Sequence, residues 1–371
     1  MNKKNGFSHF MTDCKDKKLI AFGASVFLQV MAMNYEELNL KNAISYIVDN
    51  DPDKDGTIYN LQGVAKEIHS VEYLLSDNLS NIVLLISSEG YAYEIFEQLE
   101  GIDKLKNVVC YCLPIMIAAN EDDTSIHMPG ESEDNIPKII HCFWFSGEEK
   151  DELAKKCIES WQKYCPDYEI KEWNSENYDV TKNQYMYEAY KQKKWAYAAD
   201  YARLDAVFNY GGFYFDLDLE LLRNIDELLT ADFVAGFGPL RDIELAAFGA
   251  KKNSPLVGMM LEKYKDRTFD AQNLVLTEVQ PVFLDDFMKN HGFKINGKFQ
   301  NKNNQVLLPR NAFSPRNWFT GEMMEMGDSF GIHHCAGSWI SKADKRPNRN
   351  EHMKILSNIF ISDEAMKETV C

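Results

Sequence analysis

Residues 195–221 read WAYAADYARLDAVFNYGGFYFDLDLEL, and this stretch predicts a helix, a glycine turn and a strand in succession. Tyr201, Leu204 and Phe208 recur at the i, i+3, i+7 spacing that gives a helix one buried face. The glycine pair at 211–212 ends that helix, because glycine adopts the backbone of a helix C-terminus without a steric penalty. Apolar and polar residues then alternate, which is typical of a strand with one buried side.

The predicted strand carries its acidic residues on one side, opposite the phenylalanines and leucines. That side comprises Tyr214, Asp216, Asp218 and Glu220. Two carboxylates at i, i+2 form a compact set of oxygen ligands, which Mg²⁺ or Mn²⁺ prefers and completes with phosphate and water. On the helix, Asp200 and Arg203 are i, i+3 neighbours. Spacing alone leaves an alternative open, a solvated strand face beside an ordinary helix salt bridge.

Strands and helices alternate before this stretch, which predicts α/β structure throughout. Close to it, strands at 136–145 and 168–174 flank a helix at 152–166. Nearer the N-terminus, four strands separated by helical or mixed segments predict a doubly wound sheet: 17–25, 43–51, 82–88 and 108–113. An acidic segment with Pro129 and Gly130 divides the two regions. The predicted organisation is a domain at 1–118, a linker at 119–135, a domain at 136–345 and a tail at 346–371.

The first predicted domain has only part of a dinucleotide-binding fingerprint. Gly23 follows its first strand and Asp49 ends the next, as in a Rossmann site. The following glycine positions hold Ser25 and Leu28, whose side chains would block the approach of a pyrophosphate. The pattern therefore favours a structural or docking role for a Rossmann-like domain over nucleotide binding, and it disfavours an oxidoreductase.

Charge and apolar patterning exclude several classes of protein. The 371 residues carry a net charge of −17, which disfavours nonspecific nucleic-acid binding, a function that needs lysine and arginine. The N-terminus lacks the apolar core of a signal peptide, and no run approaches the ~18 apolar residues of a spanning helix. We therefore expect a cytoplasmic protein, with at most peripheral contact at the inner face of the membrane. The eight cysteines lack CxxC spacing and are expected to be reduced and structural, not zinc ligands or disulfides.

Across residues 136–341, the motifs and their order resemble glycosyltransferase family 32 and the related catalytic domain of the clostridial glucosylating toxins. That family shows a tryptophan-bearing first strand, a helix with Asp-x-x-Arg, a Gly-Gly-x-Tyr-x-Asp-x-Asp core and a late Ser-Trp. The corresponding stretches here are IIHCFWF, Asp200 with Arg203, GGFYFDLDLELL and CAGSW. The resemblance implies a GT-A type nucleotide-sugar transferase domain, preceded by the smaller doubly wound Rossmann-like domain.

The resemblance also implies a role for each matching residue. Asp218 would bind an Mn²⁺ or Mg²⁺ ion that bridges the donor diphosphate, and Asp216 would contact the donor ribose or sugar and reach the metal. Arg203 would neutralise phosphate or orient the sugar, while Asp200 would bind donor hydroxyls and hold Arg203. Trp144 would stack on the nucleotide base, unless it is only a core tryptophan. Further predicted substrate contacts are Phe143, Gly212 and Tyr214.

Two later segments complete the predicted site. In FGIHHCAGSWI (330–340), His334 would ligate the metal, and His333 would point the other way. Ser338 and Trp339 would close over the diphosphate as a lid. Glu244 would face the reacting carbon or the acceptor. A structural histidine and a packing tryptophan are the alternatives that this late segment leaves open.

The function implied by the resemblance is that of a retaining hexosyltransferase. A hexose would move from a nucleotide diphosphate sugar, with UDP favoured, to a hydroxyl of a saccharide acceptor. By analogy, the acceptor is a capsular or surface polysaccharide, including a lipid-linked repeat. Two alternatives stay open: a noncatalytic protein that binds nucleotide sugars or polysaccharide, and a nucleotide-sugar hydrolase.

Overall fold

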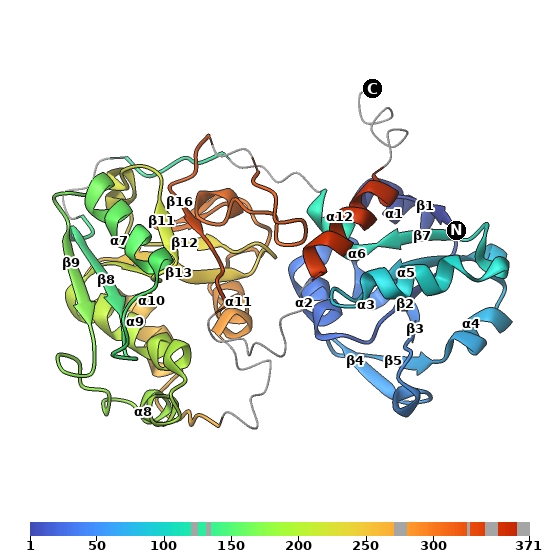
Figure 1. Cartoon of the computed structure of the whole chain (residues 1–371), viewed down its shortest axis with the longest axis horizontal. Coiled ribbons are helices and arrows are strands. Elements are labelled where there is room, and N and C mark those ends of the chain that lie inside the picture. Colours follow the sequence, from blue (N-terminus) through green and yellow to red (C-terminus); the bar gives the residue numbers. More distant parts are fainter. Residues whose placement is uncertain (120–124, 131–134, 271–279, 325–326, 338–347, 362–371) are drawn as a thin grey trace. The chain divides into compact units, whose positions relative to one another are not determined.

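The chain forms two compact units in the computed structural model (Figure 1). The structure describes residues 1–119, 125–130, 135–270, 280–324, 327–337 and 348–361. The first unit comprises Met1–Glu121, Asn317–Glu322 and Arg346–Cys371. The second unit comprises Asp122–Arg316 and Met323–Lys345.

A seven-stranded sheet forms the centre of the first unit, in the order β1-β7-β6-β2-β3-β5-β4. Its strands are β1 (Asn2–Lys3), β2 (Lys18–Phe22), β3 (Ile44–Val48), β4 (Ile58–Leu61), β5 (Val64–His69), β6 (Ile82–Ile86) and β7 (Val109–Cys112). All neighbours are parallel except β4 and β5. The chain runs outward from β2 to β3 and β5, then returns to β6 and continues to β7. Because such crossovers are right-handed, this reversal places helices on opposite faces and makes the sheet doubly wound.

The last described helix of the chain completes the first unit. The helices of this unit are α1 (Phe7–Asp13), α2 (Val26–Asn34), α3 (Leu40–Ala43), α4 (Val71–Ser76), α5 (Ala92–Glu100), α6 (Leu113–Ala118) and α12 (Arg349–Phe360). Helix α12 packs against α5 and α6 through Met353, Leu356 and Phe360, which are buried (Figure 1). The region expected to be a separate tail therefore contributes a packed helix, because one side of α12 is apolar.

The second unit also has a seven-stranded sheet, in the order β14-β15-β12-β13-β10-β8-β9. Its strands are β8 (Ile139–Phe143), β9 (Glu169–Trp173), β10 (Gly212–Phe215), β12 (Phe233–Phe237), β13 (Ile243–Ala250), β14 (Gln300–Lys302) and β15 (Gln305–Leu308). Strand β13 is antiparallel to both neighbours, whereas β9, β8 and β10 are mutually parallel and β12 is parallel to β15. The predicted α/β class is confirmed in both units, with a mixed sheet in the second unit and a mostly parallel, doubly wound sheet in the smaller first unit.

Two apolar clusters flank the sheet of the second unit. Its helices are α7 (Glu152–Tyr164), α8 (Gln184–Lys191), α9 (Trp195–Tyr210), α10 (Pro255–Glu262) and α11 (Gln280–Asn290). Tyr214 of β10 belongs to the cluster that includes Leu204 of α9. Phe213 and Phe215 belong to the other cluster, with Trp161 of α7. The alternation of β10 therefore fixes one residue set towards α9 and the other towards α7.

Two further findings bear on the expectations from the sequence. Within the described ranges, no helix is both long and apolar enough to cross a membrane. The seven cysteines in those ranges are free thiols, and five of them are buried.

Candidate active site

The acidic pair lies in a turn between two strands. Strand β10 ends at Phe215, and the Leu219 N–H donates to the Asp216 carbonyl at 3.0 Å, which closes a tight turn. Strand β11 (Leu219–Leu221) then pairs with β16 (Gly331–His333) in a separate two-stranded sheet. The expectation of one strand alternating through Glu220 is therefore wrong. The turn reorients the chain, so the two carboxylates approach groups from different directions.

The double glycine brings β10 close against its neighbours. Gly212 has φ 103°, and a Cβ at this position would lie 2.7 Å from the Ile139 carbonyl oxygen of β8. Gly211 has φ 68°, and its Cβ would lie 2.8 Å from the Lys252 backbone nitrogen. Both positions therefore require glycine for sterics and for backbone conformation. Gly212, predicted to contact substrate, is buried in this backbone contact.

Arg203 of α9 holds two of the predicted carboxylates. Its guanidinium lies 3.0 Å from Asp200 through Nη2 and 3.6 Å from Asp216 through Nη1. The same group donates to the backbone carbonyls of Ala199 at 3.2 Å and Leu245 at 3.0 Å. These partners fix the plane of the guanidinium, which lies over the ring of Tyr214.

Burial tunes the two carboxylates beside Arg203. It raises the pKa of Asp200 to about 6, although the Arg203 guanidinium opposes the rise and the Asp216 charge adds to it. Burial also raises the pKa of Asp216, with Arg203 opposing and the Asp218 charge adding. The Tyr214 hydroxyl donates to Asp216, so this carboxylate is oriented from two sides. The Arg203 guanidinium between Asp200 and Asp216 therefore stabilises the charged form of both carboxylates, which burial alone would disfavour.

Asp218 meets the strand that carries the late histidines. Its carboxylate lies 3.3 Å from His333 Nε2 and accepts from the Ala336 N–H at 2.9 Å. Burial opposes the ionisation of Asp218, but the hydrogen bond and charge of His333 hold its pKa at about 2. Asp216, Asp218 and His333 can each offer one ligand atom, all within 4.8 Å of one another. This group is a candidate site for a divalent cation.

The structure brings His333, and not His334, to the acidic pair. His334 Nε2 lies 2.9 Å from Glu220, which also pairs with Lys156 at 2.7 Å. The antiparallel register places His333 opposite Leu219, next to Asp218. The prediction that His333 would point away from the site is therefore wrong. Alternation correctly separates the two histidines, but only the pairing with β11 decides which one faces Asp218.

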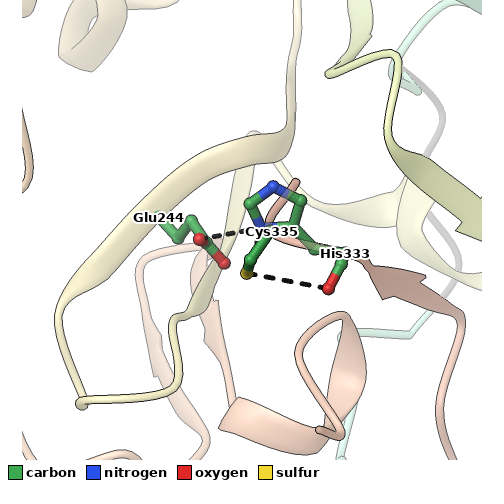
Figure 2. A group of neighbouring side chains, drawn as sticks. All are labelled: Glu244, His333 and Cys335. Atoms are coloured by element: carbon green, nitrogen blue, oxygen red, sulfur yellow. Dashed lines mark hydrogen bonds and ion pairs between the residues drawn. The ribbon is translucent and has the colours of Figure 1, made fainter. Parts of the chain in front are cut away.

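Glu244 of β13 pairs with the ring nitrogen of His333 that does not face Asp218, and Figure 2 shows this pair. One of its oxygens is 2.9 Å from His333 Nδ1, and the other accepts from the Ser314 hydroxyl at 2.7 Å. Burial alone would lower the pKa of His333, but the charges of Glu244 and Asp218 raise it well above its usual value. His333 is therefore a cation held between two carboxylates.

The aromatic residues predicted to bind substrate have different positions. Phe143 is buried among Phe145, Tyr178 and Tyr214, so its ring belongs to the core. Trp144 follows β8 and is half-buried, and its indole N–H donates to the Glu148 carbonyl at 2.6 Å. Ser338 and Trp339 lie outside the described residues.

The described side chains around this turn carry an excess of negative charge. The carboxylates are Asp200, Asp216, Asp218 and Glu244, and the cations are Arg203 and His333. The charge of Arg267 also acts on Asp200, and Asp242 adds a further carboxylate beside Glu244. A divalent cation is the species that neutralises such a group while leaving coordination positions for phosphate oxygens.

Comparison with known proteins finds relatives of this region. Residues 151–234 match the family model described as a glycosyltransferase sugar-binding region containing DXD motif. The chain is 26% identical over 172 residues to an uncharacterized glycosyltransferase of Acanthamoeba polyphaga mimivirus, covering 42% of this chain and 67% of that protein. Among solved structures, it aligns with the PaToxG glycosyltransferase at a TM-score of 0.36 and 17% identity, over 43% of this chain and 70% of the other. The first two matches confirm the predicted resemblance to DXD-containing sugar transferases.

Proposed function

We propose that the protein is a glycosyltransferase of the DXD type, which moves a hexose from a nucleotide diphosphate sugar to a saccharide hydroxyl with retention of configuration. The observation that carries the proposal is the convergence of Asp216, Asp218 and His333 within 4.8 Å, beside the Arg203–Asp200 pair. UDP is the favoured nucleotide, and a capsular or surface polysaccharide is the favoured acceptor. Both of these choices rest on the family resemblance.

The donor set fits a divalent metal ion. Two carboxylates and one imidazole suit Mn²⁺, while Mg²⁺ would use the two carboxylates and more water. When bound, such an ion would neutralise the charge that develops on the leaving nucleotide diphosphate. Asp218 and His333 are the proposed ligands, with Asp216 as a third, and His333 would lose the proton on Nε2 when it binds the ion.

The protein's own groups position the donor in this proposal. Arg203 orients Asp216 and supplies a fixed positive charge towards the diphosphate. Asp200 accepts hydrogen bonds from donor hydroxyls while it holds Arg203. The half-buried ring of Trp144 offers a stacking surface for the base, since its N–H is already satisfied. No residue is assigned as a nucleophile, because attack on the face of the leaving group needs none.

The decisive experiment compares Asp218→Asn with Glu220→Gln. Each change removes one carboxylate charge, but Glu220 pairs with Lys156 and His334, outside the proposed metal group. Both variants and the wild type are incubated with a panel of nucleotide sugars, saccharide acceptors and Mn²⁺, and products are measured by mass spectrometry. We expect Asp218→Asn to lose at least about a hundredfold in transfer, and Glu220→Gln to lose much less.

Each outcome separates the competing functions. Transfer products support the glycosyltransferase, release of free sugar supports the hydrolase, and donor-dependent thermal stabilisation without turnover supports a binding protein. Wild-type transfer by purified Asp218→Asn would contradict the proposed metal role.

A further inference from the structure

We propose that Glu244, His333 and Cys335 form a second metal site, which takes Zn²⁺ or another thiophilic divalent ion and competes with Mn²⁺ at the acidic pair for the His333 imidazole. Metal binding at this site stands independently of the proposed function. Only its inhibitory consequence rests on that function.

The three side chains converge from two separate segments (Figure 2). Glu244 lies on β13, while His333 ends β16 and Cys335 follows two residues later. His333 Nδ1 is 2.9 Å from Glu244 Oε1 and 3.4 Å from Cys335 Sγ. One ligand atom from each residue lies within 4.8 Å of the others. A small outward adjustment would place all three around one ion at metal–ligand distances of ~2.0–2.3 Å.

The surroundings already orient these ligands. Ser314 donates to the second oxygen of Glu244 at 2.7 Å, which leaves the first oxygen facing His333. The backbone N–H of His333 donates to the Phe313 carbonyl at 2.6 Å. Cys335 has φ 48°, a left-handed backbone that turns the chain back beside His333. Outer contacts of this kind hold metal ligands in position.

The donor types distinguish this site from the acidic pair. Thiolate, imidazole and carboxylate together favour Zn²⁺, whereas the mainly carboxylate set of Asp216 and Asp218 suits Mn²⁺ or Mg²⁺. Three protein ligands leave a fourth tetrahedral position for water. Binding of the ion would displace two protons, one from the Cys335 sulfur and one from Nδ1 of the His333 imidazolium.

His333 can serve only one of the two sites at a time, because a neutral imidazole binds metal through one nitrogen only. Its Nδ1 faces Glu244 and Cys335, and its Nε2 faces Asp218. With an ion on Nδ1, Nε2 carries the proton and donates to Asp218. The imidazole is then unavailable as a ligand to the metal of the acidic pair. Zn²⁺ at the second site would therefore inhibit a transferase that depends on Mn²⁺.

Cobalt spectroscopy tests the site without any activity measurement. Co²⁺ substitutes for Zn²⁺ and gives an intense thiolate-to-metal absorption band only when sulfur is a ligand. We expect this band in the full chain, its loss on addition of Zn²⁺, and its loss in Cys335→Ser. The matched control is Cys14→Ser, because Cys14 is the other described cysteine that is partly exposed. Absence of the band from the wild type, or its persistence in Cys335→Ser, would overturn the proposal.

A competition assay tests the consequence. If the protein transfers sugar with Mn²⁺, the factor by which Zn²⁺ lowers the transfer activity should be at least about tenfold smaller in Cys335→Ser than in Cys14→Ser. Equal Zn²⁺ sensitivity in the two variants would refute the inhibitory coupling. If no transfer is found, the proposed function fails, but the cobalt band still decides whether the second site exists.

Discussion

At the scale of single residues, two histidines of the second unit lie in opposite electrostatic environments. His333 is held between carboxylates, which raise its pKa well above the usual value. His141 is fully buried, and burial lowers its pKa to about 4. Its Nε2 lies 2.9 Å from the Gly211 carbonyl, and its Nδ1 accepts from the Trp173 indole at 3.1 Å. These partners fix one neutral tautomer, since a protonated Nδ1 would have to donate to another donor.

Buried His141 predicts a loss of stability in mild acid. Its pKa is about 4 in the folded chain and 6.5 in the unfolded chain, so the unfolded state binds a proton first as the pH falls. The contribution of neutral His141 to the free energy of unfolding is complete above pH 6.5. It is lost between pH 6.5 and about 4, and the loss amounts to roughly 3 kcal/mol. Urea unfolding of the wild type and His141→Gln at pH 7.5, 6 and 5 measures it. The two free energies should converge as the pH falls, and parallel curves would contradict the assignment.

At the scale of elements, the helix, turn and strand between 195 and 221 show what could be predicted from sequence. The existence of α9 and the alternation of β10 are confirmed, but the single buried face predicted for α9 is wrong. Residues 202–207 are all buried, and Tyr201 and Phe208 are only partly buried. The break at Asp216 was missed, since the turn is stabilised by a local hydrogen bond and by the pairing of β11 with a distant strand. Local patterns do not encode that pairing.

The late segment illustrates the same limit at the candidate site. The family resemblance groups Asp200, Arg203, Asp216 and Asp218 in one site, and the structure brings their side chains together. His333 and Cys335 join them only through the register of β16 and a left-handed turn. The i, i+2 pair of His and Cys in the late segment is a local sequence signal for metal ligands, but only the fold brings it to the DXD motif.

The close contact between β10 and β8 predicts that any side chain at position 212 would destabilise the pairing of these two strands. In Gly212→Ala, the new Cβ would lie 2.7 Å from a backbone oxygen, and the backbone would also be strained at φ 103°. We expect a loss of about 3 kcal/mol or more in the free energy of unfolding, from urea titration. The control is Gly56→Ala, where φ is 76° but nothing lies within 4 Å, so only about 1–2 kcal/mol should be lost. Equal losses in the two variants would show that the β8 contact contributes nothing.

At the scale of the whole molecule, chain order and spatial grouping differ. The first unit begins at Met1, yet it also contains Asn317–Glu322 and α12. In the short segment, Trp318 donates to Glu89 at 2.9 Å and Asn317 donates to the Ala118 carbonyl at 3.0 Å. Arg349 at the start of α12 also pairs with Glu89. Stability of the first unit therefore depends on residues encoded after most of the second unit.

A substitution in α12 should therefore act at a distance in sequence. Leu356 is fully buried, and Leu356→Ala should destabilise the first unit by about 2–5 kcal/mol through the cavity that it leaves. Hydrogen exchange should accelerate in α5 and α6, which α12 contacts, while β10 and β13 of the second unit serve as the internal reference. The adjacent Ile355 is 38% exposed, so Ile355→Ala controls for loss of an apolar side chain from the same helix. If exchange accelerates only in α12, or equally in β10 and β13, the assignment of α12 to the first unit is contradicted. A helix that completes the core of the first unit should, when it is destabilised, expose the helices that it contacts before it affects the second unit.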